Sequence, residues 1–410
     1  MTREVRGRRW VAVRPAAWLV AALICAPAAA SAQAPSSGDE RPSMTLGPFE
    51  LRPRLLFNNI GVDNNVFNER EDPKRDWTFG AQPDLEITVR PGRAKIVWLS
   101  GTEFLYYHRY KSERSVNRSQ SFSGELDLNF LRPFASYSSS HTSARPNMEI
   151  DVRARRHPRS YAFGTGLKIA TRTTATFTVR NSREKYDEEI YFRGQELAET
   201  LNNRGRTYES SIGLQLTPLT TLSLVVGRDE LRFDSEPLRN SNATRIAPTF
   251  NFSPLGLLSG ALSVGYKRFE GVDASLPGYS GLAANGTLTA LLGGRYRLET
   301  RLTRDVQYSY EETLPYYVMT GGRVTLATQV TNLVDLRATA GRDRLDYRAF
   351  GDGESRGADI LEVYGGGVGL RIGERRRLVV QSEFTRRRSE RSDEREFRNH
   401  RIFATLTWGA

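Results

Sequence analysis

The sequence lacks long apolar runs, and it contains a single cysteine. Beyond the N-terminal segment, no stretch approaches the ~18 consecutive apolar residues of a transmembrane helix. Cys25 lies inside that segment, so the rest of the chain can form neither a disulfide nor a cysteine metal site. Helical periodicity is nearly absent, as are phosphate loops, dinucleotide fingerprints and nucleophile elbows. These absences exclude a helical membrane protein and the enzyme classes that carry such motifs.

Residues 1–32 have the pattern of a secretory signal peptide. A basic start leads into a short apolar stretch, Trp18 to Ala28, followed by the small-residue cleavage site Ala30-Ser31-Ala32. The apolar stretch is too short to span a bilayer. We therefore expect export and cleavage near Ala32, with residues 33–48 as a Ser/Pro-rich periplasmic lead-in.

The remaining chain alternates apolar and polar residues over long segments. The final one is typical: Ile402, Ala404, Leu406 and Trp408 alternate with polar or inward-facing neighbours. Soluble strands average five or six residues, whereas a membrane-spanning strand needs ~9–11, and the segments 295–310 and 333–347 are long enough. A terminal strand that ends in an aromatic residue is also what outer-membrane barrels present to the barrel assembly machinery.

Short turns and longer polar loops follow each other along the chain. The turns are expected at 91–93, 131–133, 171–173, 218–220, 254–256, 293–294, 330–332 and 373–375. The clearest loops are 61–76, 144–158, 187–204, 234–242, 271–280, 348–356 and 388–395. Short periplasmic turns and long external loops are typical of outer-membrane barrels. A soluble propeller would repeat a blade signature, and none recurs.

The sequence thus predicts an all-β protein in the outer membrane of a Gram-negative cell. Residues 49–410 are expected to form a transmembrane antiparallel up-and-down β-barrel of about eighteen strands (16 to 18). Aromatic residues near the strand ends, such as Trp77, Tyr106, Tyr208 and Tyr266, fit interfacial girdles. Ordinary strand propensity is the alternative explanation for them.

If the apolar positions face lipid, the alternate positions line a pore. The candidate lumen residues are Arg90, Lys168, Arg180, Lys267, Arg295, Arg297, Glu299, Arg301, Asp335, Arg337, Arg371 and Glu383. An excess of positive charge there would favour anionic solutes by focusing the potential. Alternatively, the charges pair and only keep the lumen polar.

Two further groups of side chains need an interpretation. The arginines 386–388, with Arg391 and Arg395, are expected at the outer rim, in contact with lipopolysaccharide phosphates or an acidic polymer, or in a solvated loop. The histidines His108, His141, His157 and His400 lack metal-ligand spacing. We expect no catalytic residue, metal, cofactor or nucleic acid; the alternative is a hydrolase that uses Ser138 or Ser140 beside His141.

The segment Gly61-Val62-Asp63-Asn64-Asn65-Val66-Phe67 follows Leu51-Arg52-Pro53-Arg54 and the first expected strand. This arrangement resembles the N-terminal signature of the β-barrel porin type 2 family. Members of that family include outer-membrane barrels associated with exopolysaccharide and capsule clusters, some of them exosortase-linked. The resemblance implies a barrel and suggests a link to extracellular polysaccharide. In the motif (Gly61, Asp63, Asn65, Val66, Phe67), Asn and Asp suit a tight turn, and Val66 and Phe67 can pack back on the barrel.

The favoured hypothesis is a non-enzymatic, porin-like barrel that passively exports or anchors an acidic exopolysaccharide. The alternatives are a general diffusion porin for small solutes, or a barrel plugged by a loop such as Asp187–Arg204, in which residues 196–201 could form helical turns. The expected partners are outer-membrane lipid and lipopolysaccharide, the barrel assembly machinery, an anionic polysaccharide and periplasmic export proteins.

Overall fold

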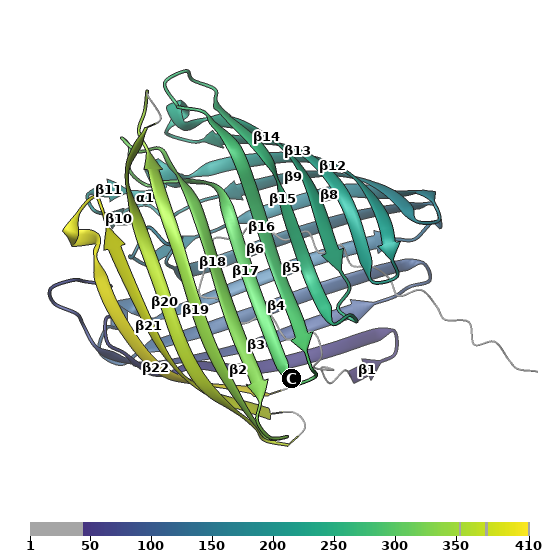
Figure 1. The fold of residues 1–410 in the computed structure, drawn as a ribbon, viewed down its shortest axis with the longest axis horizontal. Coiled ribbons are helices and arrows are strands. Elements are labelled where there is room, and N and C mark those ends of the chain that lie inside the picture. Colours follow the sequence, from purple (N-terminus) through teal and green to yellow (C-terminus); the bar gives the residue numbers. More distant parts are fainter. Residues whose placement is uncertain (1–43, 352–353, 374–375, 409–410) are drawn as a thin grey trace, which may run out of the picture.

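The computed structural model describes residues 44–351, 354–373 and 376–408. The signal peptide and most of the lead-in lie outside these residues. The described chain forms a closed antiparallel barrel of eighteen strands, in which each strand pairs with the next and β22 (Phe397–Trp408) returns to pair with β2 (Phe49–Asp63) (Figure 1). The predicted fold class and strand number are confirmed. Within the described residues, no helix has the length and apolar character needed to cross a bilayer.

The barrel strands are β2 (Phe49–Asp63), β3 (Asp76–Val89), β4 (Ala94–Tyr107), β5 (Ser115–Leu126), β6 (Leu131–Ala144), β8 (Arg159–Ala170), β9 (Thr173–Glu184), β12 (Asn203–Thr217), β13 (Thr220–Phe233), β14 (Ser241–Phe252), β15 (Leu258–Gly271), β16 (Tyr279–Leu292), β17 (Tyr296–Tyr308), β18 (Tyr316–Gln329), β19 (Val334–Arg348), β20 (Ser355–Arg371), β21 (Arg376–Ser389) and β22 (Phe397–Trp408). Short elements outside the wall are β1 (Met44–Leu46), β7 (Ala154–Arg156), β10 (Tyr191–Phe192), β11 (Gln195–Glu196) and α1 (Leu197–Leu201). Single 3₁₀ turns occur at Lys111–Glu113, Pro237–Arg239 and Asp393–Arg395.

The predicted turns match the observed ones with one displacement. The turn expected at 131–133 lies inside β6, and the chain instead reverses at 127–130. There Asn129 takes a left-handed conformation (φ 70°) and its amide donates to Asp127 Oδ1, which suits a tight reversal. Within the expected lead-in, residues 44–46 form β1, which pairs with the start of β2. Residues 374–375 of the last predicted turn lie outside the described residues.

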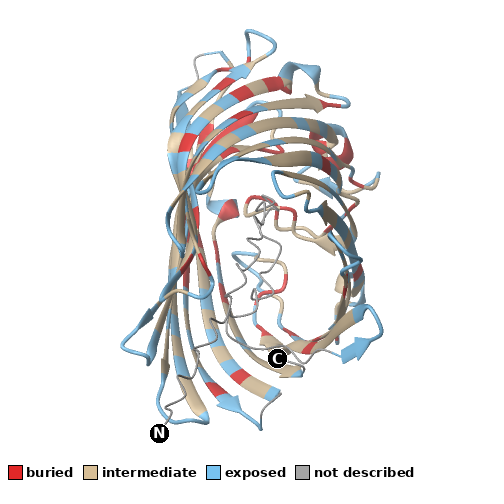
Figure 2. Cartoon of the chain, turned by 90° about the vertical axis from the view of Figure 1, so that its right-hand side faces the viewer, coloured by how far each residue is buried: buried red, intermediate tan, exposed pale blue. Residues whose placement is uncertain are grey.

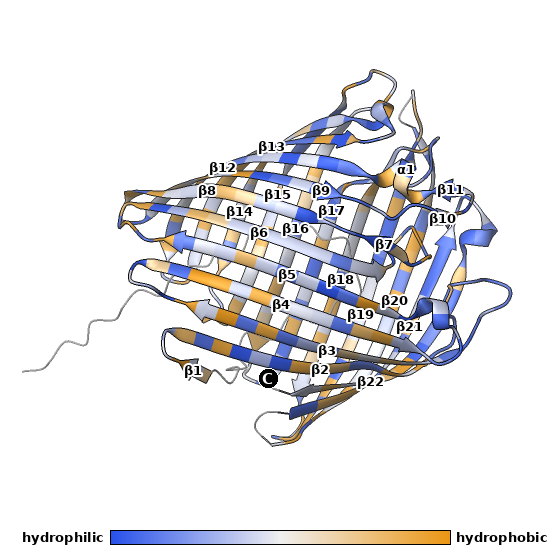
Figure 3. Cartoon of the chain, turned by 180° about the vertical axis from the view of Figure 1, so that it is seen from behind, coloured by the Kyte–Doolittle hydropathy of each residue, from blue (hydrophilic) through white to orange (hydrophobic). Residues whose placement is uncertain are grey.

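Side chains along each strand alternate between an apolar outer face and a polar inner face. Large exposed apolar residues such as Ile212, Leu214, Val324 and Ile402 define the outer face. Figure 3 shows the same alternation of hydrophobic and hydrophilic positions along the strands. On four neighbouring strands, the outward rings of Trp98, Phe122, Tyr137 and Tyr161 stand in a row, with successive centroids 5.9, 6.5 and 4.9 Å apart. This outer surface suits lipid.

Toward the long-loop end, arginines replace the apolar residues on the outer face. They share the strand side of exposed apolar residues such as Phe122, Ile212, Tyr266 and Ile402. We call them the outer arginine belt: Arg118, Arg159, Arg183, Arg204, Arg206, Arg228, Arg268, Arg304, Arg342, Arg344, Arg386, Arg388 and Arg398. The belt lies on the side of the apolar band toward the loops that outer-membrane barrels expose outside the cell.

Candidate channel and its constriction

The structure places most of the predicted lumen residues on the inner face of the wall. They alternate with outward apolar residues, as Arg297, Glu299 and Arg301 do with exposed Tyr296 and Leu302. The inner-face residues are Lys168, Arg180, Lys267, Arg297, Glu299, Arg301, Asp335, Arg337, Arg371 and Glu383. Arg90 and Arg295 are exceptions, because both lie outside the strands and are exposed, at the short-turn end. An eighteen-stranded barrel is wide enough for an aqueous lumen.

Several inner-face charges form ion pairs across or along the strands. Lys267 Nζ lies 2.6 Å from Asp305 Oδ1, and Arg297 Nε lies 2.8 Å from Glu299 Oε1. Arg377 pairs with Asp335 at 2.6 Å. Near the short turns, Glu50 accepts from both Arg52 (2.6 Å) and Arg90 (2.8 Å). Much of the wall therefore stays polar without presenting a net charge.

Arg301 and Arg323 are arranged differently. They stand directly opposite each other on β17 and β18, both on the inner face. Opposed residues on neighbouring strands hold their Cβ atoms about 4.5–5.5 Å apart, and like charges in that position destabilise a sheet. Among the described residues neither guanidinium has a hydrogen bond or ion pair. Two inner-face acids lie nearby by register: Glu299, two residues before Arg301 on β17 and paired with Arg297, and Asp343, on β19 beside Gly321.

Several inner-face charges, Arg323 among them, were not predicted from the sequence. The signal was present, because Arg323 precedes the outward Val324 in the same alternating pattern. Arg245 and Arg401 were not predicted either, although each precedes an exposed outward isoleucine, Ile246 or Ile402. Arg245 pairs with Glu209 two strands away, and Arg401 lies 3.5 Å from Asp63.

The loop 145–153 leaves the end of β6 and reaches strands far from it along the wall. Glu149 is fully buried and accepts from Ser309 Oγ (2.7 Å) and the Tyr310 amide (3.2 Å), both just after β17. Burial raises the pKa of the Glu149 carboxyl to about 7, despite the nearby Arg395 guanidinium. Burial likewise raises the pKa of the Tyr310 hydroxyl to about 12. The loop therefore folds across the mouth of the barrel.

The arginines expected at the outer rim or in a solvated loop instead form buried contacts with the loops that cross the barrel. The prediction is therefore wrong for Arg387, Arg391 and Arg395. Arg387 points inward, is 2 % exposed, and donates to Asp151 Oδ2 (2.6 Å) and to the Met148 carbonyl. Arg391 forms a bidentate pair with Glu311 (2.9 and 2.5 Å).

Arg395 completes the network from the loop before β22. It donates to Asp359 Oδ2 (2.8 Å), Glu311 Oε1 (2.9 Å) and the Tyr347 hydroxyl (2.8 Å). The surrounding negative charges raise the pKa of Arg395 above its ordinary value even though burial opposes this. Arg395 therefore stays charged, and the acids that the crossing loops bury around it are compensated.

The loop 185–202 enters the same space from β9 and β12. Its helix α1 confirms the helical turns expected at 196–201. Leu197, Ala198 and Leu201 are buried against Ile150 of the first crossing loop and Tyr310 of the loop after β17. Figure 2 shows α1 and buried loop segments inside the ring of strands. Together, the loops 145–153, 185–202 and 309–315 form a constriction, and we use this name for them below.

The ends of β17 and β18 also turn inward. Pairing between β16 and β17 stops at Ala284 and Arg304, and the continuing strand carries Tyr308 to the inner faces of β13 and β15. The Tyr308 ring lies 4.8 Å from Phe233 and 6.1 Å from Phe269, and its hydroxyl contacts Ser241 Oγ. Arg239, buried and donating to the carbonyls of Thr200, Ser309 and Pro315, ties this bend to the constriction.

The family-like motif closes the barrel. The Asn65 side chain, 1 % exposed, donates to the carbonyls of Glu69 (2.7 Å) and Arg398 (2.9 Å), and Asp63 Oδ1 accepts from the Asn65 amide. A Cβ on Gly61 would collide with the Ile402 carbonyl oxygen. Val66 is buried, and Phe67 packs edge-on against Tyr110 (5.0 Å between centroids). The contacts of Gly61 and Asn65 join this segment to β22, and Phe67 joins it to the loop after β4.

The described part of the chain holds no group of three potential metal ligands among its His, Cys, Asp and Glu side chains. His141 and His157 share a hydrogen bond (2.9 Å), and His157 also contacts Asp187 (2.8 Å). Ser138 and Ser140 lie on the inner face of β6, whereas His141 lies on the outer face. The serine–histidine pairing considered for a hydrolase is therefore wrong.

Comparison with known proteins gives one family and a group of similar folds. The family described as "Putative beta-barrel porin 2" matches residues 42–409. The outer membrane protein OpdK from Pseudomonas aeruginosa is similar at 9% identity and a TM-score of 0.49, over 87% of this chain and 99% of that one. OccK2 (OpdF) from the same organism is similar at 10% identity and 0.51, over 87% and 97%. No curated protein matches the sequence.

Proposed function

Because the chain belongs to the β-barrel porin 2 family, and so forms a porin-like barrel of the outer membrane, we propose that it is a passive channel for small solutes that prefers anions. The observation that carries the proposal is the pair Arg301 and Arg323 on the inner wall. The exopolysaccharide export favoured by the sequence is replaced by the small-solute alternative.

The opposed guanidinium groups make a site for a negative charge in the lumen. Two like charges facing each other repel, and a solute anion between them relieves that repulsion. Arginine presents donors in a fork that suits carboxylates and phosphates. The paired charges elsewhere on the wall keep the lumen hydrated and do not repel the anion.

The constriction supports a small solute over a polymer. Loops from β6, β9 and β17 meet through buried contacts such as Glu149 with Ser309 and Leu197 with Tyr310. An extended polymer would have to displace these contacts, whereas small solutes need only pass beside them. As a non-enzymatic route, such a channel requires no cofactor.

The test is ion selectivity of the refolded mature chain in a planar bilayer. Reversal potentials in a KCl gradient report the ratio of anion to cation permeability, and glucuronate, the ligand in a structure of OccK2, serves as an organic anion. The double variant Arg301→Gln/Arg323→Gln should lose the anion preference, and Arg301→Lys/Arg323→Lys should retain most of it. The matched control is Arg304→Gln/Arg342→Gln, which removes the same charge from the outer face of β17 and β19.

Cation preference in the wild-type channel, or equal selectivity in the wild type and the inner double variant, would overturn the anion preference. A correctly folded barrel without conductance would overturn the channel itself and favour the plugged barrel.

A further inference from the structure

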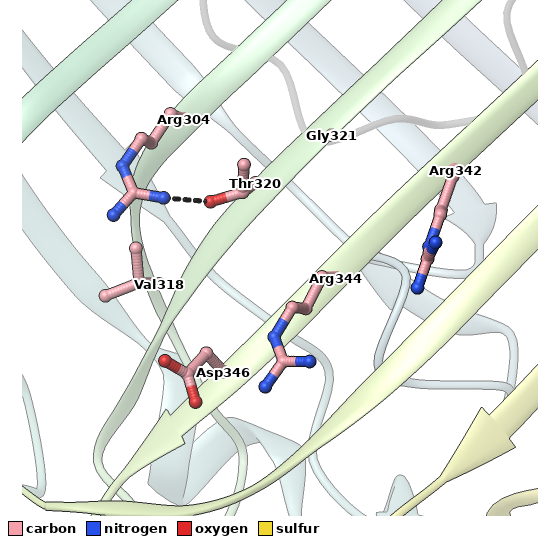
Figure 4. Close-up of a pocket in the computed structure, with 7 residues that line it drawn as sticks. All are labelled: Arg304, Val318, Thr320, Gly321, Arg342, Arg344 and Asp346. Carbon is pink, nitrogen blue, oxygen red and sulfur yellow. Dashed lines mark hydrogen bonds between the residues drawn. The ribbon is translucent and has the colours of Figure 1, made fainter.

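The outer face of β17, β18 and β19 carries a cavity lined by arginines. It has a volume of about 360 Å³, and its polar lining consists of Arg304, Thr320, Arg342, Arg344 and the carboxylate of Asp346 (Figure 4). Register explains the grouping, since Arg304, Thr320 and Arg344 stand side by side on consecutive strands. The cavity lies where β17 parts from β16, after the pair Ala284 and Arg304.

The strand alternation places these side chains outside the barrel. Arg304 shares its side of β17 with Leu302, and Thr320 shares its side of β18 with Val324, both of which are 42% exposed. Arg342 lies on the same side of β19 as exposed Leu336. In Figure 4 the side chains lie in front of these strands, with the opposite wall behind them. These arginines therefore lie on the opposite face of the wall from Arg301 and Arg323.

The cationic groups in this cavity are poorly neutralised by the described residues. Arg304 Nη1 donates to Thr320 Oγ1 (2.5 Å), a neutral partner. The nearest carboxylate to Arg344 belongs to Glu390, at 3.8 Å. Asp346 is already engaged by Arg348 (2.7 Å) and by Ser355. Arg342 has no hydrogen bond or ion pair with any described residue, which leaves its guanidinium for an outside anion.

We propose that this cavity binds a phosphate group of lipopolysaccharide in the outer leaflet. The apolar side chains that face lipid lie next to the cavity, on its side toward the short turns. The headgroup of a surrounding lipid therefore reaches the level of the arginines. Arginine pairs with phosphate oxygens in a bidentate manner and remains charged at that interface. The cavity is continuous with the outer arginine belt, which supplies the same chemistry on the neighbouring strands.

The proposal can be tested separately from the channel function. Arg301 and Arg323 lie on the inner face of β17 and β18, whereas the cavity lies on the outer face of the same strands. The probe is bis-phosphorylated lipid A, added to the refolded full mature chain in detergent micelles, with binding followed by native mass spectrometry. Lipid A without phosphates and inorganic phosphate alone are the comparison ligands.

We expect the wild type to retain bis-phosphorylated lipid A, and Arg304→Gln/Arg342→Gln to bind it about tenfold or more weakly. The inner variant Arg301→Gln/Arg323→Gln should bind it like the wild type. If the double variant does not fold, the single change Arg342→Gln removes the unpartnered guanidinium alone and should still weaken binding severalfold.

Equal binding by the wild type and the outer variants would overturn the proposal. So would equal retention of lipid A with and without phosphates, which would assign the contact to the acyl chains. If inorganic phosphate displaced all of the bound lipid A, the cavity would be a site for free anions. That result would also overturn the lipid assignment.

Discussion

Arg387 of β21 and Asp151 of the loop after β6 form an ion pair at 2.6 Å across 236 residues of sequence. The guanidinium is almost completely buried, and it also donates to the Met148 carbonyl. This pair holds the first crossing loop against the far wall and so helps to define the constriction.

Removing the pair should widen the channel. In Arg387→Met, the loop loses its ion pair with the wall, and the Asp151 carboxylate keeps only the hydrogen bond from Asn68. Breaking a buried ion pair in this way costs about 3–5 kcal/mol of stability. We expect a higher single-channel conductance, with the barrel still closed as judged by heat-modifiable migration in gels. Arg386→Met, one residue away and facing outward, is the control. Unchanged conductance in Arg387→Met would argue against a loop-defined constriction.

The buried Glu149 should make the constriction sensitive to pH. Its pKa is about 7 when the loop is docked and near the ordinary 4.5 when the loop is released. Between these values the docked state binds the additional proton, so docking is strongest near pH 4.5 and weakens as pH rises toward 7. We expect channel opening to become more frequent across that window in the wild type and to depend little on pH in Glu149→Gln. More frequent opening on acidification from pH 7 to 4.5 would contradict the assignment.

Gly61 should be essential for closing the barrel. A Cβ at this position meets the Ile402 carbonyl on the paired strand, so Gly61→Ala must push β2 and β22 apart. The expected result is a low refolding yield into detergent micelles, measured by the fraction of folded species in unheated gels. Gly124→Ala on β5, where an added Cβ meets nothing within 4 Å, is the matched control and should refold like the wild type. Equal refolding yields for both variants would show that Gly61 is not needed for β2 to pair with β22.

Asn65 should stabilise the loop 64–75 without taking part in conduction. Asn65→Ala leaves the carbonyls of Glu69 and Arg398 without their donor, which costs about 1–3 kcal/mol for each buried group left unsatisfied. Limited proteolysis should cut this loop faster in the variant, while Asn285→Ala on β16 should be digested like the wild type. Resistance equal to the wild type would show that the loop is held by other contacts.

The wall of the barrel was predictable because its signal is local. Alternation of two residues places Arg297, Glu299 and Arg301 on one side of β17 and Leu302 on the other, without reference to any distant part of the chain. The tight turns were equally local, since glycines such as Gly293 and Gly294, with φ of 57° and 68°, mark the reversal directly. Even the weakly patterned segments 134–141 and 244–252 formed strands, because a closed wall leaves no other place for them.

The constriction was not predictable from such patterns. Arg387 and Arg395 look like solvated loop arginines in sequence, and nothing near them indicates Asp151 or Glu311 as partners. The inward bend of β17 likewise depends on Phe233 and Phe269, whose burial follows from packing and not from periodicity. Side chains that meet only through tertiary contact leave no periodic trace in sequence.

The hydrogen bond from Asn65 to the Arg398 carbonyl has a consequence for the order of assembly. Its two residues are 333 positions apart, so the bond can form only after β22 has reached β2. Until then β2 and β22 each keep one unpaired edge and the loop 64–75 lacks its contacts with β22, which makes closure a late step in folding. The first loop of the barrel is therefore among the last parts to become ordered, and its protection from hydrogen exchange reports the moment of closure.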